Sequence, residues 1–196
     1  MTKPKEIERG GGYEFWHPFR GPGYKTPTAD VGDGDNQGTP LWLFNLLREE
    51  WLFSGGDLFA AHGNALLGRY WTEDRPIITR DFENAGLTFW ANPPYSRGNI
   101  RAAAETVREL TELGNRVVGL TRAEPTAEWW WRTLRPACAE VRLLDTRLTF
   151  RGQPNLYNFP CWVWVAVPPM QRRGEPHVWF WDASEIHDKF IGGGKS

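Results

Sequence analysis

Cysteine is scarce in this chain, and long apolar stretches are missing. The two cysteines, Cys138 and Cys161, stand far apart in a sequence of 196 residues and have no CxxC spacing. This argues against a zinc site or a disulfide scaffold and favours a reducing compartment. No run approaches the roughly 18 consecutive apolar residues of a membrane-spanning helix, and residues 1–20 lack the apolar segment of a signal peptide. We therefore expect a cytoplasmic protein that does not span a membrane.

An excess of positive charge is also missing. Lysine and arginine total 23 against 24 aspartates and glutamates, which gives a formal net charge of −1. Proteins that bind nucleic acid usually carry a basic surface, so any affinity for DNA has to come from a local cluster. Such a cluster lies between residues 142 and 173, where a single acid, Asp145, is outnumbered by five arginines: Arg142, Arg147, Arg151, Arg172 and Arg173.

Several motifs of known chemistry are absent as well. The sequence has no glycine-rich phosphate loop, no GxSxG, no HExxH and no EF-hand pattern, and its four histidines show no metal-ligand spacing. We therefore expect no bound metal. The length of 196 residues and the hydrophobic content of 40% are typical of one globular domain with a single core.

The composition divides the chain into three segments. Residues 1–38 are rich in glycine, proline, aspartate and lysine, and we interpret them as an irregular or mobile arm. Ordered structure is expected from Thr39-Pro40, because threonine is a favourable N-cap and proline a favourable first helical residue. The main domain is expected over residues 39–170, and residues 171–196 form a C-terminal extension.

Helical and strand patterns alternate along the main domain. Helices are expected at residues 40–50, 60–70, 100–113 and 126–135, the third closed by Gly114. Strands are expected leading to Asp57 and at 76–79, 87–91, 116–121, 141–145, 148–150 and 161–167, and a strand and a short helix after residue 174. The alternation predicts an α/β domain with a mostly parallel sheet and helices on both of its faces. The strand-dense end predicts a C-terminal antiparallel hairpin.

The most informative segment is Trp90-Ala91-Asn92-Pro93-Pro94-Tyr95-Ser96. It follows an apolar strand, so a loop stiffened by two prolines would stand at the carboxyl edge of the sheet, where open α/β sheets bind ligands. The amide oxygen of Asn92 and the backbone carbonyl of Pro93 offer two hydrogen-bond acceptors, and the ring of Tyr95 can stack on a planar group. A plain proline turn is the simpler interpretation, but the position directly after a strand favours the functional one.

Two acceptors in such a loop suit the methylation of a weakly nucleophilic nitrogen. The exocyclic amine of adenine is a poor nucleophile because its lone pair is delocalised into the ring. Acceptors aimed at its two N–H groups free that lone pair for attack on a sulfonium methyl group. A base in a duplex has to be extruded to reach such a pocket. The same geometry would serve a glutamine amide or an RNA amine, so the motif alone indicates an amine or amide on a planar system.

The order of motifs is more specific than the loop by itself. TPLWLFNLLREEWLFSGGDLFAAHGNALLGRYWTED is followed by WANPPYS, by GNRVVGLTRAEPTAEWWW and by VRLLDTRLTFRGQPNLYNFP. Over about residues 38–168 this order resembles the phage-type, Dam-like DNA N6-adenine methyltransferases of bacteriophages and prophages. The resemblance implies a Rossmann-like fold with a seven-stranded type of sheet. It also implies S-adenosylmethionine as cofactor and double-stranded DNA as substrate.

The resemblance also implies roles for single residues. Thr39 and Pro40 fall where the family's opening motif helps to hold the methionine end of the cofactor. Asp57 falls at the acidic position after the first strand, and Asp81 where an acid borders the adenine moiety of the cofactor. Residues 92–95 (Asn92, Pro93, Pro94 and Tyr95) correspond to the catalytic loop. The chain departs from the family in two places: Asp57-Leu58 replaces the usual Asp-Pro, and Leu120-Thr121-Arg122 replaces Leu-x-Pro.

Contacts to DNA are expected near the end of the domain. Phe159, in an Asn-Phe-Pro loop before a strand, matches the place where related enzymes present an aromatic ring to the extruded base; Phe150 is the competing candidate. Arg147, Arg151, Arg172 and Arg173 flank this loop and are predicted to contact phosphates. Two alternatives to a DNA methyltransferase stay open: an enzyme acting on a protein glutamine or RNA amine, and a catalytically silent DNA-binding relative.

Overall fold

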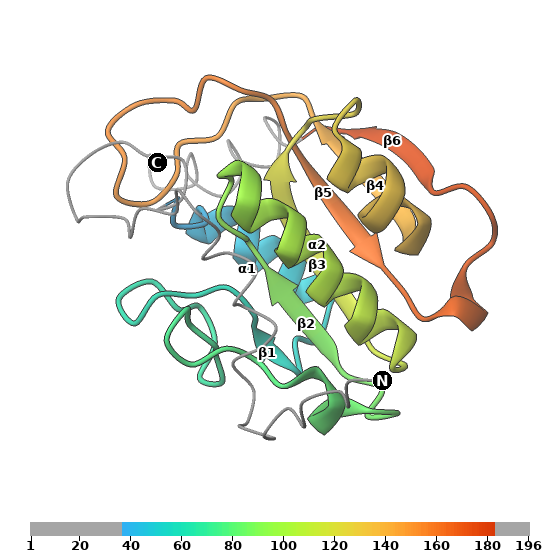
Figure 1. Ribbon diagram of the computed structural model, residues 1–196. Coiled ribbons are helices and arrows are strands. Elements are labelled where there is room, and N and C mark those ends of the chain that lie inside the picture. Colours follow the sequence, from blue (N-terminus) through green and yellow to red (C-terminus); the bar gives the residue numbers. More distant parts are fainter. Residues whose placement is uncertain (1–36, 183–196) are drawn as a thin grey trace, which may run out of the picture.

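A mixed β-sheet forms the centre of the molecule (Figure 1). The computed structural model describes residues 37–182. In this part of the chain six strands lie side by side in the order β1-β2-β3-β5-β4-β6. Their bounds in that order are Gly56–Asp57, Thr88–Ala91, Arg116–Arg122, Cys161–Ala166, Cys138–Leu144 and His177–Trp181.

The directions of the strands define one functional edge. β1, β2 and β3 pair in parallel, and β4 pairs in parallel with β6. β5 runs antiparallel between β3 and β4. The other five described strands therefore end at the same edge of the sheet, which we call the carboxyl edge. Asp57, the loop after Ala91 and the Phe159-Pro160 segment before β5 all lie at this edge.

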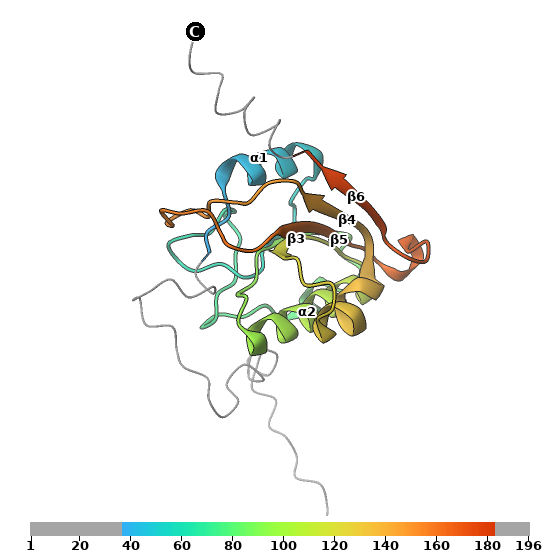
Figure 2. The same cartoon turned by 90° about the horizontal axis from the view of Figure 1, so that it is seen from above.

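Helices cover both faces of the sheet, as Figure 2 shows. Helix α1 (Leu41–Glu50) lies on one face, and helix α2 (Arg97–Glu112) lies on the other, beside the π-helical turn η4 (Trp130–Leu134). The short 3-10 turns are η3 (Thr79–Phe82), η5 (Arg135–Ala137) and η6 (Pro169–Gln171). The expected α/β class with two helical layers is confirmed.

The central strands are continuous apolar runs because both of their faces are covered. Every residue of β2 and β5 is buried. Gly119 in β3 is required by this packing, because a Cβ there would lie 2.1 Å from the indole of Trp164. Gly114 ends α2 with φ of 92°, the left-handed conformation expected of a glycine that closes a helix.

Arg142 ties α1 to the outer strands and is a structural residue. Its side chain is 4% exposed and forms ion pairs with Glu50 in α1 and Glu140 in β4. The guanidinium also lies over the rings of Trp179 and Trp181, 5.0 and 5.1 Å from their centroids. One arginine of the predicted basic cluster is therefore neutralised inside the protein.

Several predicted elements are wrong. Residues 60–70 form turns and bends instead of a helix, and residues 76–79 and 148–150 form no strand. The helix predicted at 126–135 begins at residue 128 and widens into η4. The antiparallel pairing expected near the C-terminus is between β4 and β5, which are joined by residues 145–160, and β6 then pairs in parallel with β4.

The predicted N-terminal arm falls mainly outside the described residues. Gln37 and Gly38, its last two residues, are described and contact the domain. The short helix predicted after residue 182 also lies outside the described range. No helix between residues 37 and 182 is long and apolar enough to cross a membrane.

Candidate active site

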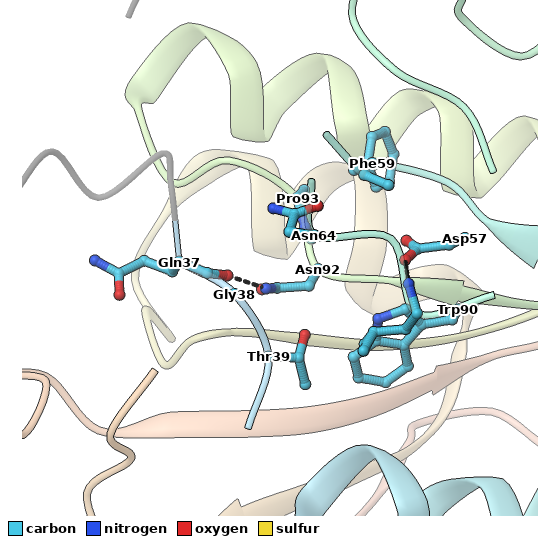
Figure 3. Close-up of a pocket in the computed structure, with 11 residues that line it drawn as sticks. Gln37, Gly38, Thr39, Asp57, Phe59, Asn64, Trp90, Asn92 and Pro93 are labelled. Atoms are coloured by element: carbon cyan, nitrogen blue, oxygen red, sulfur yellow. Dashed lines mark hydrogen bonds between the residues drawn. The ribbon is translucent and has the colours of Figure 1, made fainter. Parts of the chain in front are cut away.

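A pocket at the carboxyl edge brings together segments that are far apart in the sequence (Figure 3). Thr39 comes from the start of α1, Asp57 from the end of β1, and Asn92 and Pro93 from the loop after β2. The predicted cofactor residues Thr39 and Asp57 thus share one pocket with two residues of the predicted catalytic loop. The full lining is Gln37, Gly38, Thr39, Asp57, Phe59, Ala60, Asn64, Leu66, Trp90, Asn92 and Pro93.

Asp57 places a carboxylate in the wall of this pocket. The residue is 4% exposed, and its Oδ2 accepts a hydrogen bond from the backbone N–H of Leu66 at 3.1 Å. Burial raises the pKa of Asp57 from its ordinary 3.8 to about 6, although the N–H groups of Leu66 and Phe59 and the charge of Arg151 oppose the rise. Because this pKa lies below 7, the carboxylate is mostly ionised at neutral pH and can attract a cationic ligand.

Asn92 is held at both ends of its amide. Its Nδ2 donates to the backbone carbonyl of Gln37 at 2.6 Å, and its Oδ1 accepts from the hydroxyl of Tyr95 at 3.0 Å. Pro93 is buried beside it, and Pro94 is half-buried and does not line the pocket. The loop is therefore fixed by side-chain bonds in addition to the two prolines.

Tyr95 lies in an aromatic cluster behind the loop. It is 6% exposed, and its ring contacts those of Phe150 and Tyr157 at centroid distances of 6.1 and 5.9 Å. Burial raises the pKa of the Tyr95 hydroxyl well above its usual range, so this hydroxyl stays protonated and donates to Asn92. The contact that the structure shows for Tyr95 is this hydrogen bond to Asn92, and stacking of its nearly buried ring on a base stays a prediction.

A groove lies on the other side of Tyr95. It has a volume of about 720 Å³, within the roughly 300–1,000 Å³ typical of small-molecule sites. Phe159 is 48% exposed in its wall, and the guanidinium of Arg122 lies 4.9 Å from the centroid of the Phe159 ring. Trp129 lines the groove too, and its indole N–H donates to Glu124 at 3.4 Å.

The two candidates for base stacking, Phe159 and Phe150, differ in how much of each side chain is exposed. Phe159 borders the groove, whereas Phe150 is 1% exposed and packs edge-on against Tyr157 at 5.2 Å. A ring without accessible faces does not stack on a ligand. Phe150 is therefore a core residue, and Phe159 is the one of the two that can meet a base.

The arginines predicted to contact phosphates do not form one surface. Arg151 is half-buried, donates from its guanidinium to the carbonyl of Asn64 at 2.5 Å and pairs through its backbone with Gly38. Arg172 donates to the carbonyl of Val167 and to Thr111, which lie at the opposite edge of the sheet. Both guanidinium groups are thus engaged within the protein, and the phosphate contacts of Arg151 and Arg172 stay a prediction. Of the four, Arg147 and Arg173 are exposed, and only Arg147 follows a strand that ends at the carboxyl edge.

Asp81 is not part of the pocket. It is exposed in η3, and the neighbouring carbonyl of Phe82 accepts a hydrogen bond from Asn115, just before β3 begins. This is the amino edge of the strands. Pro40 is buried at the N-cap of α1 and does not line the pocket either. Neither position supports direct contact with a ligand bound beside Asp57.

Several polar or aromatic residues for which no role in the site was predicted also line the two cavities. Gln37 and Asn64 line the pocket, and Arg122 and Trp129 line the groove. Asn64 lies in the first of the quoted segments that carry the family resemblance, seven residues after Asp57, which was the available signal. Gln37 lies in a segment whose composition predicts no fixed structure, and only the fold reveals it. Within residues 37–182, no group of three His, Cys, Asp or Glu side chains is arranged to hold a metal ion.

Comparison of the sequence with models of known protein families identifies one family. Residues 25–165 match the model of the family described as DNA N-6-adenine-methyltransferase (Dam), which is more than two thirds of the chain. No curated protein matches the sequence. The matched range includes strands β1 to β4, all of β5 except its last residue, the pocket around Asp57 and Asn92, and the groove around Phe159. The chain therefore belongs to the Dam family of DNA N-6-adenine methyltransferases.

Proposed function

We propose that the chain transfers a methyl group from S-adenosylmethionine to the N6 amine of adenine in DNA. The observation that carries the proposal is the meeting of Asp57, Asn92 and Pro93 in one pocket at the carboxyl edge, in a chain of this family. We further propose that the sheet is Rossmann-like, with the antiparallel β5 inserted between β3 and β4. Ligands of open α/β sheets bind at the carboxyl ends of the strands.

The pocket offers an acidic acceptor that suits the cofactor's cationic amine. Asp57 offers a buried carboxylate for the cationic amine or a hydroxyl of the cofactor. The cavity has a volume of about 20 Å³, below the roughly 300–1,000 Å³ typical of small-molecule sites.

The loop after β2 acts on the target amine. The bound cofactor supplies a methyl group on a positively charged sulfur. Asn92 Oδ1 and the Pro93 carbonyl accept the two N–H groups of the target amine, which favours a tetrahedral nitrogen with its lone pair free. Tyr95 keeps Oδ1 of Asn92 in place through its hydroxyl. The protein's contribution is orientation and electrostatics.

The groove beside Tyr95 suits the extruded adenine. It adjoins the pocket through the Tyr95–Asn92 hydrogen bond, so a base in the groove would bring its amine toward Asn92. Phe159 and Trp129 provide aromatic surface for stacking. We assign the pocket to the cofactor and the groove to the base.

Labelled cofactor tests the proposal directly. The protein is incubated with tritiated S-adenosylmethionine and, separately, with unmethylated duplex DNA, RNA and denatured protein. We expect label in DNA alone. Label in RNA or in protein glutamine would replace the substrate class, and cofactor binding without transfer to any of the three would identify a silent DNA-binding relative.

A further inference from the structure

Residues 37–39, which we call the strap, line the pocket, and Gln37 contacts Asn92. The strap directly precedes the N-terminal end of α1. It is separated from Asn92 by more than fifty residues of sequence. The backbone carbonyl of Gln37 accepts the Nδ2–H of Asn92 at 2.6 Å (Figure 3). This contact does not follow from the chemistry of the Asn-Pro-Pro-Tyr motif.

The contact decides which end of the amide faces the substrate. An asparagine amide has an acceptor oxygen and a donor nitrogen that occupy nearly the same space. The Tyr95 hydroxyl can donate or accept, so it would tolerate either orientation. The Gln37 carbonyl can only accept, so it requires Nδ2 on its side. The opposite orientation would present N–H groups to the N–H groups of the target amine and abolish the attraction.

The strap is itself held firmly in place. The carbonyl of Gly38 accepts the backbone N–H of Arg151 at 2.6 Å, and the Arg151 side chain reaches on to the carbonyl of Asn64. A Cβ at position 38 would lie 3.1 Å from both the Cβ and the backbone oxygen of Arg151. Thr39, the next residue, is 3% exposed. A side chain at Gly38 would therefore push the strap away from Arg151 and with it the Gln37 carbonyl.

We propose that the strap is a positioning element of the methyl-transfer site, in which the Gln37 carbonyl fixes the amide of Asn92 with Oδ1 toward the target amine. This inference rests on the proposed function. It assigns a catalytic purpose to a segment that sequence composition alone marks as irregular. It also explains why the pocket is lined by backbone from before α1.

Substitution of Gly38 tests the inference. Gly38→Ala and the bulkier Gly38→Val should lower kcat about tenfold or more at saturating cofactor and DNA, a part of the roughly 10²–10³ lost when one acceptor is removed. Gly68→Ala is the matched control, because a Cβ there meets no atom within 4 Å, and it should keep the wild-type kcat. In the same variants, the side-chain amide NMR signals of Asn92, identified by their loss in Asn92→Ala, should move toward the shifts of a free amide.

A double-mutant cycle with Asn92→Asp adds a readout that general destabilisation would not give. A carboxylate has an acceptor at both ends, so it needs no orienting carbonyl, and Gly38→Ala should then have little further effect on kcat. A fall in kcat together with the shift of the amide signals supports the strap. Unchanged kcat in both Gly38 variants, or a fall without a shift of the amide signals, overturns it. If Asn92→Ala itself methylates at the wild-type rate, the proposed function fails instead.

Discussion

At the scale of single residues, Asp57 is placed where it opposes folding. Its carboxylate lies at the end of β1 with 4% of its surface exposed, and desolvation outweighs the hydrogen bond from Leu66. A pKa of about 6 instead of 3.8 means that the folded protein binds a proton more tightly than the unfolded chain does. Buried charges that weaken the fold are common at functional sites. The buried carboxylate therefore supports the proposal that Asp57 binds the cofactor.

Removing this charge should stabilise the protein at neutral pH. Because the folded-state pKa is raised, the stability associated with Asp57 is present below pH 3.8 and is lost as the pH rises to about 6. The loss corresponds to roughly 3 kcal/mol if the whole shift is expressed. We expect Asp57→Asn to raise the free energy of unfolding at pH 7 by about 1–3 kcal/mol in urea titrations. Equal stability of variant and wild type at pH 7 would contradict the desolvated environment.

The same carboxylate predicts how cofactor affinity depends on pH. A cationic amine favours the ionised form, so binding should release a proton when the free protein is near pH 6. Affinity should be full above pH 7 and fall by up to about tenfold per unit below pH 6. Calorimetry in buffers of different ionisation enthalpy measures the released proton. The exposed Asp81→Asn is the control and should keep wild-type affinity, whereas a loss there would return Asp81 to the cofactor site.

At the scale of elements, the aromatic residues around Tyr95 differ in exposure: one packs in the core, and another is open to a ligand. Phe150 is 1% exposed in the core and Phe159 is 48% exposed at the groove, yet both lie in the connection between β4 and β5. Because both residues are phenylalanines in different environments, the same substitution at the two positions separates an effect on stability from an effect on base binding. The groove is bounded on one side by the Tyr95 loop and on the other by the segment that leads into β5.

Phe159→Ala and Phe150→Ala should therefore have opposite profiles. Phe150→Ala removes a buried ring and should lower the free energy of unfolding by about 3–5 kcal/mol. Phe159→Ala should leave stability near that of the wild type and slow methylation, since base stacking contributes roughly 1–3 kcal/mol. A mismatch opposite the target adenine should partly restore the rate of Phe159→Ala, because extrusion then costs less. Wild-type rates on normal duplex DNA for Phe159→Ala would remove Phe159 from the base site.

The accuracy of the predicted elements follows from how much tertiary structure each one needs. β2, β3, β5 and α2 were predictable, because their apolar periodicity is set by burial on the sheet. The segment 60–70 has helical spacing of apolar residues, but Gly63 and Gly68 weaken a helix. In the fold it has to deliver the Leu66 N–H to Asp57, and near its C-terminal end the carbonyl of Arg69 accepts the backbone N–H of Asp57 in β1. No local pattern encodes that requirement.

The candidate site was predictable to the same extent. Asn92, Pro93, Asp57 and Thr39 carry sequence signals and meet in one pocket. Gln37 carries none, because its contribution is a backbone carbonyl. Arg151 was expected to face DNA and instead spans from the strap to Asn64, since its neighbours are set by long-range contacts that the sequence does not display.

At the scale of the whole molecule, the charge balance limits how DNA is held. The net charge is −1, and the arginines between residues 142 and 173 are dispersed over both edges of the sheet. Arg142 and Arg172 are engaged inside the fold. Arg147 is exposed after β4, near the carboxyl edge, and Arg173 is exposed at the other edge. DNA that reaches the groove is therefore expected to meet Arg147 and not Arg173.

Salt dependence distinguishes these two arginines. Each phosphate contact releases about one counterion, so Arg147→Ala should reduce the slope of log affinity against log salt by about one. The fall in affinity should be similar for all DNA sequences, because a phosphate contact reads no base. Arg173→Ala is the control and should keep the wild-type slope in fluorescence anisotropy titrations. The reverse pattern would place the DNA on the opposite edge of the sheet.

Nucleoside analysis of treated DNA tests the central claim most directly. Unmethylated duplex DNA is incubated with S-adenosylmethionine and either the wild-type protein or Asn92→Ala, digested to nucleosides and resolved by mass spectrometry. We predict N6-methyladenine with the wild type and a rate about 10²–10³ lower with Asn92→Ala, while calorimetry finds cofactor affinity close to normal in the variant. Methylated cytosine as the product, or N6-methyladenine formed equally fast by Asn92→Ala, would contradict the account.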